Sequence, residues 1–226
     1  MKNVIITGTS RGIGLELVKI FNNNGIKVLA LSRDMSSIEE LCSNNVHGFS
    51  FDITKQTDID KVASYVESQF GSVDAIIHNA GALIAKPLSM LSYDDFEYIY
   101  KVNVFGVAML TKALIPYLSK GGHVVSISSI GGVRGSVKFP GLSAYSSSKG
   151  ALITLTEVLA EEYKDAQIAF NVLALGAVQT KMLTEAFPDY KTDMLPKDMA
   201  QYIYDFTLTG HKYYNGKVLE VSNSTP

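Results

Sequence analysis

A phenol and an ammonium group stand four residues apart in the stretch GLSAYSSSKG, at Tyr145 and Lys149. Residues at this spacing share one face of an α-helix, so a helix that begins near Tyr145 would direct both side chains into one cleft. To accept a proton from an alcohol at neutral pH, the tyrosine must be a phenolate. Its pKa must then fall by about three units, which requires stabilising the phenolate by about 4 kcal/mol. A cation about 4 Å away supplies about that amount at an effective dielectric constant near 20, and only about 1 kcal/mol in water. The pair therefore predicts a proton-transfer site if it is partly buried, and a solvated helix turn if it is not.

The same spacing occurs a second time, at Tyr213 and Lys217, so the spacing alone does not identify a site. This second pair brackets an Asn-Gly turn, and the residues after the turn alternate as in a strand. Side chains on such a backbone do not share a helical face. We therefore expect no catalytic role for Tyr213 and Lys217.

Short runs rich in β-branched residues alternate with helical patterns along the whole chain, and these elements must position any site. Because a parallel crossover needs a helix, the alternation predicts a doubly wound α/β fold of the Rossmann type. We expect one domain over residues 1–226, with a seven-stranded parallel sheet and helices on both faces. The predicted strands are 4–7, 27–31, 48–51, 73–77, 123–128, 168–175 and 217–221, and the predicted helices include 14–24, 59–70, 96–118 and 150–163.

The composition is that of a soluble globular protein, with 46% hydrophobic and 19% charged residues in 226. A formal charge of −2 without a basic stripe argues against nucleic acid or an anionic membrane as a partner. The single cysteine, Cys42, allows no internal disulfide, and the four scattered histidines have no metal-ligand spacing. The first residues enter a predicted strand at once, which leaves no room for a signal peptide. We expect a cytoplasmic protein that needs no metal.

A glycine-rich loop, TGTSRGIG, joins the first predicted strand to the first predicted helix. Its glycines, Gly8, Gly12 and Gly14, permit a tight turn, close approach of the backbone to a pyrophosphate, and close helix packing. The start of the helix offers free N–H groups and a favourable dipole to that anion. Strand, glycines and helix in this order predict a dinucleotide-binding site.

The choice between NAD(H) and NADP(H) depends on the end of the second predicted strand, ALSRD. Where an NAD-binding protein is expected to have a carboxylate, this chain has Ser32, followed by Arg33. Arg33 and Arg11 of the glycine loop could both reach a 2′-phosphate, which favours NADP(H). Asp34 keeps NAD(H) open as the alternative, because a shift of one residue in the turn would bring its carboxylate to the ribose.

These residues together resemble the short-chain dehydrogenase/reductase family over essentially the whole chain. The matching motifs follow in the order and spacing of the family, and they are TGTSRGIG, HNAG at 78–81, Asn103 in VNVFG, SISS ending at Ser129, YSSSK at 145–149 and LGAVQT at 175–180. The resemblance implies reversible hydride transfer between a nicotinamide cofactor and an alcohol or carbonyl group. It also implies a homodimer or homotetramer.

Residue by residue, the resemblance assigns a catalytic group and a cofactor site. The catalytic group would be Asn103, Ser129, Tyr145 and Lys149, with Ser129 binding the substrate oxygen and Asn103 holding a water that links Lys149 to solvent. For Asn103 a purely structural role, as a buried amide bonded to backbone, stays open. The cofactor site would consist of Gly8, Ser10, Arg11, Gly12, Ile13, Gly14, Arg33, Asp52, Ile53, Asn79, Ala80, Gly81, Tyr145, Lys149, Gly176, Val178 and Thr180.

The chain departs from the family pattern at three points. His78 replaces the usual first Asn of the NNAG motif, and Leu175 replaces the usual Pro before Gly176. The segment from Ser129 to Tyr145 is a few residues longer than usual, which leaves Ser128 as an alternative to Ser129, although the register of the preceding strand favours Ser129.

The favoured function is NADPH-dependent reduction of a small carbonyl compound, or the reverse oxidation of an alcohol, with Tyr145 as proton donor or acceptor. The alternatives are an NAD-dependent alcohol dehydrogenase and a non-catalytic sensor that binds NADP(H). A sugar epimerase or dehydratase would need a larger substrate portion after Gly176. The substrate pocket should be lined by the 131–144 loop and the irregular 181–197 segment, with Phe139, Met182, Leu183 and Phe187 as candidates for an apolar wall.

Overall fold

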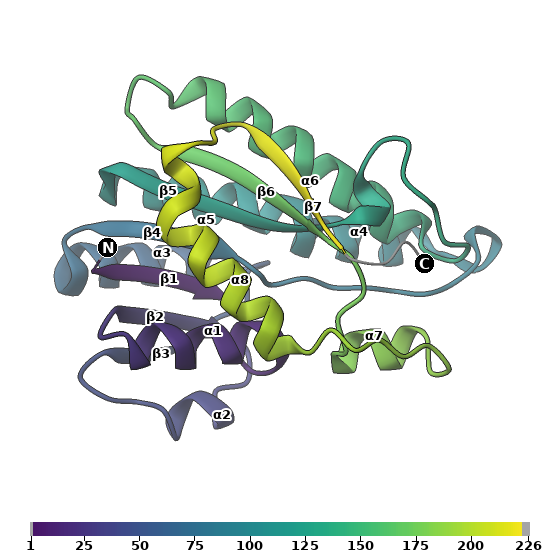
Figure 1. Cartoon of the computed structure of the whole chain (residues 1–226), viewed down its shortest axis with the longest axis horizontal. Helices are drawn as coiled ribbons and strands as arrows, with labels where there is room; N and C mark the ends of the chain where they lie inside the picture. The colour runs from purple at the N-terminus through teal and green to yellow at the C-terminus, as the bar shows by residue number, and fades with distance from the viewer. Residues whose placement is uncertain (1, 223–226) are drawn as a thin grey trace.

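The computed structural model describes residues 2–222, and seven strands in that range form one parallel sheet (Figure 1). The strand order is β3-β2-β1-β4-β5-β6-β7, so the chain reverses direction across the sheet between β1 and β4. This confirms the predicted fold class. The strands are β1 (Asn3–Thr7), β2 (Lys27–Ser32), β3 (Val46–Ser50), β4 (Val73–His78), β5 (Leu118–Ser129), β6 (Ala169–Leu175) and β7 (Lys217–Val221).

Helices cover both faces of the sheet because alternate strand residues are apolar on each side. Val4 and Ile6 of β1 belong to the core beneath α1 (Gly12–Asn23) and α8 (Pro196–Thr209), which cover one face together (Figure 1). Ile5 between them belongs to the core of the opposite face. That face is covered by α3 (Gln56–Tyr65), α5 (Gly106–Leu114) and α6 (Ser143–Glu162).

Two segments differ from the sequence prediction. The sequence reasoning assigned no helix to α8, although Met199, Ile203 and Phe206 recur at helical spacing and are buried. The segment predicted to be irregular, 181–197, contains the short helix α7 (Lys181–Ala186). The remaining helices are α2 (Ser36–Glu39), α4 (Tyr93–Tyr100), a π-helical turn at Val66–Phe70, and single 3₁₀ turns at Leu88–Met90, Ile115–Tyr117, Ile130–Gly132 and Gly210–Lys212.

The long predicted helix 96–118 is helical, but it is not a regular α-helix. A π-helical turn, Lys101–Phe105, joins α4 to α5 and contains Asn103. Such turns insert one extra residue into a helix and are frequent at functional sites. By length and hydropathy alone, the run Tyr93–Tyr117 could cross a membrane. In this fold, however, Ile99 and Leu110 of the same run pack in the core beside the sheet.

A buried histidine links three strands and a helix. His123 of β5 donates from Nδ1 to the Thr207 carbonyl of α8 (3.0 Å) and accepts at Nε2 from the Asn171 side-chain amide of β6 (3.0 Å). The side-chain oxygen Oδ1 of Asn171 in turn accepts from the Lys217 backbone N–H of β7 (3.1 Å). Only a neutral imidazole fits these partners, and burial lowers the pKa of His123 to about 4.

His78, at the end of β4, is a second buried neutral histidine. Its Nε2 donates to the Thr111 hydroxyl oxygen (2.8 Å), because that hydroxyl donates its own proton to the Val107 carbonyl. Burial lowers the pKa of His78 to about 3. The residue that departs from the family's asparagine therefore serves as a packed, uncharged link between β4 and α5.

These two histidines predict a loss of stability in mild acid. Both have folded-state pKa values below the unfolded value of about 6.5, so the unfolded chain binds more protons as the pH falls below that value. Between pH 7 and pH 5 we expect each histidine to lower the free energy of unfolding by about 1–2 kcal/mol. Urea denaturation at the two pH values measures this loss.

His123→Gln should reduce the dependence on pH even if it lowers stability at pH 7. Phe170→Leu, a core substitution in β6 that removes no titratable group, is the matched control and should keep the full dependence. An unchanged pH dependence in His123→Gln would contradict the account.

Candidate active site

One large cleft opens at the carboxyl ends of the central strands, with a volume of about 590 Å³. This is the edge at which open α/β sheets bind ligands, beside the point where the strand order reverses. The cleft extends from the glycine loop after β1, past the ends of β2 and β4, to the start of α6 and the α7 segment. Its volume is within the usual range for small-molecule sites, about 300–1,000 Å³.

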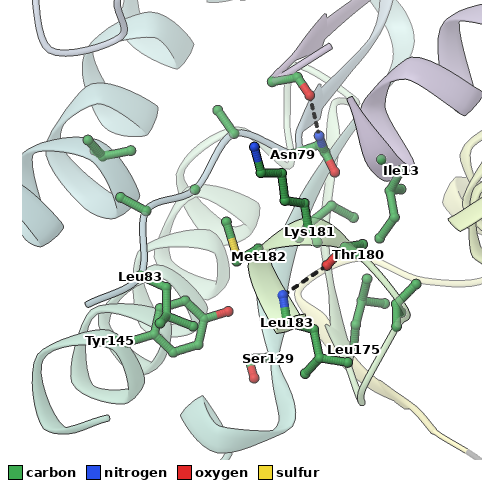
Figure 2. A pocket seen from close by; sticks show the side chains of 18 of the residues that line it. Ile13, Asn79, Leu83, Ser129, Tyr145, Leu175, Thr180, Lys181, Met182 and Leu183 are labelled. Atoms are coloured by element: carbon green, nitrogen blue, oxygen red, sulfur yellow. Dashed lines mark hydrogen bonds between the residues drawn. The ribbon is translucent and has the colours of Figure 1, made fainter. Parts of the chain in front are cut away.

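The glycine loop has the conformation that its composition predicts. Gly8 and Gly12 have φ values of +73° and +59°, which are left-handed conformations that favour glycine. A Cβ on Gly8 would also lie 2.8 Å from the Ala80 Cα, so no side chain fits there. Asn79, which Figure 2 shows beside the cleft, holds the loop by donating to the carbonyls of Thr7 (3.0 Å) and Gly8 (3.1 Å).

The start of α1 suits an anionic group. Its N-cap residue, Arg11, makes no side-chain capping bond, and the first turn contains no acidic residue. The first N–H groups of this 12-residue helix therefore have no carboxylate from the helix's own first turn beside them, and Gly12 and Ile13 of that turn line the cleft. This fits the pyrophosphate of a dinucleotide, which Gly8, Ser10, Gly12 and Ile13 would hold.

The predicted catalytic pair lies in the first turns of α6, as the helical spacing requires. Tyr145 faces the cleft, whereas Lys149 is 4% exposed and donates from Nζ to the Ile127 carbonyl (2.8 Å). Burial raises the pKa of Tyr145 to about 12, although a hydrogen bond with Ser129 lowers it in part. Burial lowers the pKa of Lys149 to about 8.

The predicted lowering of the phenol pKa by Lys149 is therefore not found. The ammonium nitrogen lies 5.8 Å from the centroid of the Tyr145 ring and is directed to a backbone carbonyl. In the protein by itself, loss of solvent outweighs the attraction between the two groups, so each is shifted toward its neutral form. The phenol is an acid at neutral pH, and not a base.

Ser129, rather than Ser128, presents its hydroxyl to the phenol. Ser129 accepts from the Gly131 N–H (3.2 Å) and lies near enough to Tyr145 to lower the pKa of the phenol in part, and both side chains line the cleft. Ser128 donates to the Lys149 carbonyl (3.0 Å) and is 3% exposed. Of the two serines at the end of β5, it is therefore Ser129, the one that the sequence favoured, that faces the cleft beside Tyr145.

Asn103 lies behind the cleft wall in the π-helical turn. It accepts from the Ala82 N–H (2.8 Å) and donates to the Ala82 carbonyl (2.9 Å) and to the Ser148 hydroxyl (2.9 Å). Ser148 in turn donates to the Tyr145 carbonyl (2.7 Å). The side chain thus links the segment after β4 to the helix that holds the catalytic pair, which is the structural role that the sequence left open.

At the other end of the cleft, the Asp34 carboxylate accepts hydrogen bonds from a residue two positions further along the chain. The backbone N–H and the hydroxyl of Ser36 both donate to Asp34 Oδ1 (3.0 and 2.8 Å), and these bonds lower the pKa of the Asp34 carboxyl. Arg33 and Arg11 line the same cleft. Arg11 Nη2 lies 3.8 Å from Glu185 of α7, an ion pair in which both side chains are about half exposed.

The structure brings all but two of the predicted site residues into this cleft. Those that line it are Gly8, Ser10, Arg11, Gly12, Ile13, Arg33, Asp52, Ile53, Asn79, Ala80, Gly81, Ser129, Tyr145, Lys149, Gly176, Val178 and Thr180. Asn103 lies behind its wall, and Gly14 packs where a Cβ would meet Gly8 and Asn79. Tyr213 and Lys217 do not line it.

Sequence reasoning missed Leu83 as a cleft residue. It follows the NAG motif on the segment after β4 and lines the same cleft as Tyr145. The signal was available, because apolar residues just beyond a strand's carboxyl end reach the same edge of the sheet as the other site residues.

The family model for short chain dehydrogenase matches residues 2–191. Among curated proteins, the chain is similar to an oxidoreductase, BOA17, of Botryotinia fuckeliana, with 34% identity over 181 residues. That match covers 77% of this chain and 65% of the relative, so the chain spans less than two thirds of the relative's length.

Two solved structures share the fold and differ in their bound cofactor. A 3-ketoacyl-(acyl-carrier-protein) reductase of Brucella melitensis in complex with NADH has a TM-score of 0.86 and 26% identity. A short chain dehydrogenase of Shigella flexneri in complex with NADP has a TM-score of 0.88 and 26% identity. Each match covers 97% of this chain and 96% of the other. The fold thus accommodates either nicotinamide dinucleotide.

The Asn103 contacts predict a stability effect that is separate from chemistry. Asn103→Ala leaves the buried N–H and carbonyl of Ala82 without partners, and we expect it to lower the free energy of unfolding by about 2–4 kcal/mol. Chemical denaturation measures the change. Ser148→Ala removes only one of the contacts and should cost about 1 kcal/mol. Equal stability of Asn103→Ala and the unaltered protein would contradict the structural role.

Proposed function

The chain belongs to the short chain dehydrogenase family, and from this premise we propose that it reduces the carbonyl group of a small molecule with NADPH, or oxidises the corresponding alcohol. The observation that supports this proposal best is the meeting of Tyr145, Ser129 and Lys149 in one cleft with the glycine loop. A site that only bound a dinucleotide would not need a half-buried phenol and a buried ammonium beside a serine hydroxyl.

Reduction of a carbonyl requires a hydride at carbon and a proton at oxygen. A bound nicotinamide dinucleotide would supply the hydride, which no side chain can provide. Tyr145 donates its hydroxyl proton to the carbonyl oxygen and becomes a phenolate. Ser129, hydrogen-bonded to Tyr145, donates to the same oxygen and orients it, and its contact favours the charge that develops there. Lys149 supplies positive charge that stabilises the phenolate once it has formed.

The pKa values support the direction of proton transfer. A phenol with a pKa of about 12 remains protonated at neutral pH and is ready to donate. An ammonium with a pKa of about 8 is mostly charged at neutral pH, and it is acidic enough to give a proton back to the phenolate between turnovers. Both properties suit reduction better than oxidation.

The preference for NADP(H) draws on the ribose end of the cleft. Arg33 and Arg11 offer guanidinium groups for a 2′-phosphate, and such pairs form strong charge-assisted hydrogen bonds. The alternative, a preference for NAD(H), requires the Asp34 carboxylate to bind the ribose hydroxyls. The bonds from Ser36 to Asp34 Oδ1 orient this carboxylate toward the start of α2, and they support Arg33 as the selecting residue.

Tyr145→Phe tests the proton donor. We expect kcat for carbonyl reduction to fall by about 10²- to 10⁴-fold, because general acid catalysis contributes about that factor. The dissociation constant for NADPH, measured by fluorescence titration, should remain within about twofold, because the substitution removes one hydroxyl and no charge. Tyr213→Phe, in the second Tyr-x-x-x-Lys pair, is the matched control and should keep its activity. Unchanged turnover in Tyr145→Phe would refute the assignment.

Arg33→Ala tests the cofactor preference. Hydrogen bonds to charged groups contribute about 1.5–3 kcal/mol, so we expect NADPH binding to weaken by about tenfold or more. NADH binding should change little, since it has no 2′-phosphate. In Asp34→Asn, both cofactors should bind as before. If Asp34→Asn weakens NADH binding while Arg33→Ala leaves NADPH binding intact, the carboxylate governs the site and the NADP(H) proposal fails.

A further inference from the structure

The end of the cleft around the catalytic hydroxyls is enclosed by apolar side chains from separate segments. Leu83 follows β4, Leu142 precedes α6, and Leu183 belongs to α7; all three line the cleft. Figure 2 shows Leu83 and Leu183 on either side of the Tyr145 and Ser129 hydroxyl groups. A substrate whose carbonyl oxygen reaches these hydroxyls must therefore place its substituents against hydrocarbon.

Arg33, Asp34, Lys149 and Lys181 line the cleft, but each lies away from this apolar end or is directed away from it. Arg33 and Asp34 lie at the opposite end, where β2 ends, and the Lys149 ammonium is bonded to a backbone carbonyl. Lys181 lies nearer, but its Nζ is 3.6 Å from Glu185, and Figure 2 shows its side chain directed toward Asn79 and away from Leu83. An anionic substrate group would be buried beside Leu83 and Leu183 without a cation to pair with.

Two aromatic rings form the outer part of this apolar region. Phe139, in the loop before α6, and Phe187, at the end of α7, pack with centroids 6.4 Å apart and planes inclined at 59°. Both rings line the cleft and remain partly exposed to it. Aromatic rings favour tilted or offset neighbours at about 4.5–7 Å, so this pair offers a further flat ring a matching surface.

The loop that presents Phe139 is fixed by its own hydrogen bonds. The Lys138 ammonium donates to the Val133 carbonyl (2.5 Å) and to the Ser136 hydroxyl (2.7 Å). The Ser136 hydroxyl donates to the Ile130 carbonyl (2.5 Å). These bonds also engage the Lys138 charge, so the longer connection between β5 and α6 places a ring, and not a cation, at the cleft.

We propose that the substrate is an uncharged ketone or aldehyde that bears an aromatic ring, with the ring bound against Phe139 and Phe187 and the carbonyl at Tyr145 and Ser129. This substrate class rests on the proposed carbonyl reduction. It excludes substrates that carry a carboxylate, sulfonate or phosphate near the reacting carbon.

Three ketones of similar size test the two parts of this proposal: acetophenone, benzoylformate, which carries a carboxylate on the carbonyl carbon, and cyclohexyl methyl ketone. We expect kcat/KM with NADPH to be higher for acetophenone than for benzoylformate by about 100-fold or more, because the carboxylate would be buried beside Leu83 and Leu183. Acetophenone should exceed cyclohexyl methyl ketone by about two- to tenfold, the range of a ring-ring contact.

Variants of the ring pair assign the preference to its residues. Phe139→Leu and Phe187→Leu should each remove most of the advantage of acetophenone over cyclohexyl methyl ketone. Val137→Ala, an exposed position in the same loop, is the matched control and should keep that advantage. A ring preference that survives in both Phe variants would overturn the assignment to this pair.

Ligand binding separates this inference from the reductase proposal. Tyr145→Phe loaded with NADP⁺ should bind acetophenone and not benzoylformate in isothermal titration calorimetry. If that binding pattern holds but the unaltered protein reduces none of the ketones, the reductase proposal fails and the pocket inference stands. If benzoylformate is bound or reduced as well as acetophenone, the inference is overturned and the reductase proposal stands.

Discussion

Burial of the ionisable pair at the start of α6 is the constraint on which the account of this site depends. Loss of solvent raises the pKa of Tyr145 to about 12 and lowers that of Lys149 to about 8, so each group is shifted toward its neutral form. A neutral phenol beside a serine hydroxyl is a proton donor. In the protein by itself the phenol therefore stays protonated at neutral pH.

Two asparagine side chains hold the parts of this site together. Asn79 fixes the glycine loop through the carbonyls of Thr7 and Gly8, and Asn103 joins the segment after β4 to the helix of the catalytic pair. Both bonds involve the segment that follows β4, at the point where the strand order reverses, because Asn79 belongs to it and Asn103 binds its Ala82. The glycine loop and the start of α6, from distant parts of the chain, are thus fixed relative to one another through this segment by side-chain amides.

Sequence reasoning predicted most of this arrangement because the governing signals are local. Strand and helix periods separated the seven strands, and the glycines with a following helix predicted the left-handed loop conformation that Gly8 and Gly12 adopt. It missed α8, whose Met199, Ile203 and Phe206 follow two prolines and a polar stretch that suggested an irregular connector. It also left open whether Lys149 lowers the pKa of Tyr145. That depends on where the Lys149 ammonium points, and no pattern in the sequence specifies that its partner is the Ile127 carbonyl.

The ionisation of Tyr145 in the protein without cofactor tests the central claim most directly. Carbon-13 labelling of the tyrosine ring would report it by NMR, with Tyr145→Phe identifying the signal. The account predicts a phenol that is still protonated at about pH 10, where an ordinary tyrosine is half ionised, and that titrates only near its raised pKa of about 12. A phenolate signal that appears at about pH 7–9, below the ordinary tyrosine value, would show that Lys149 dominates over burial and would contradict the account.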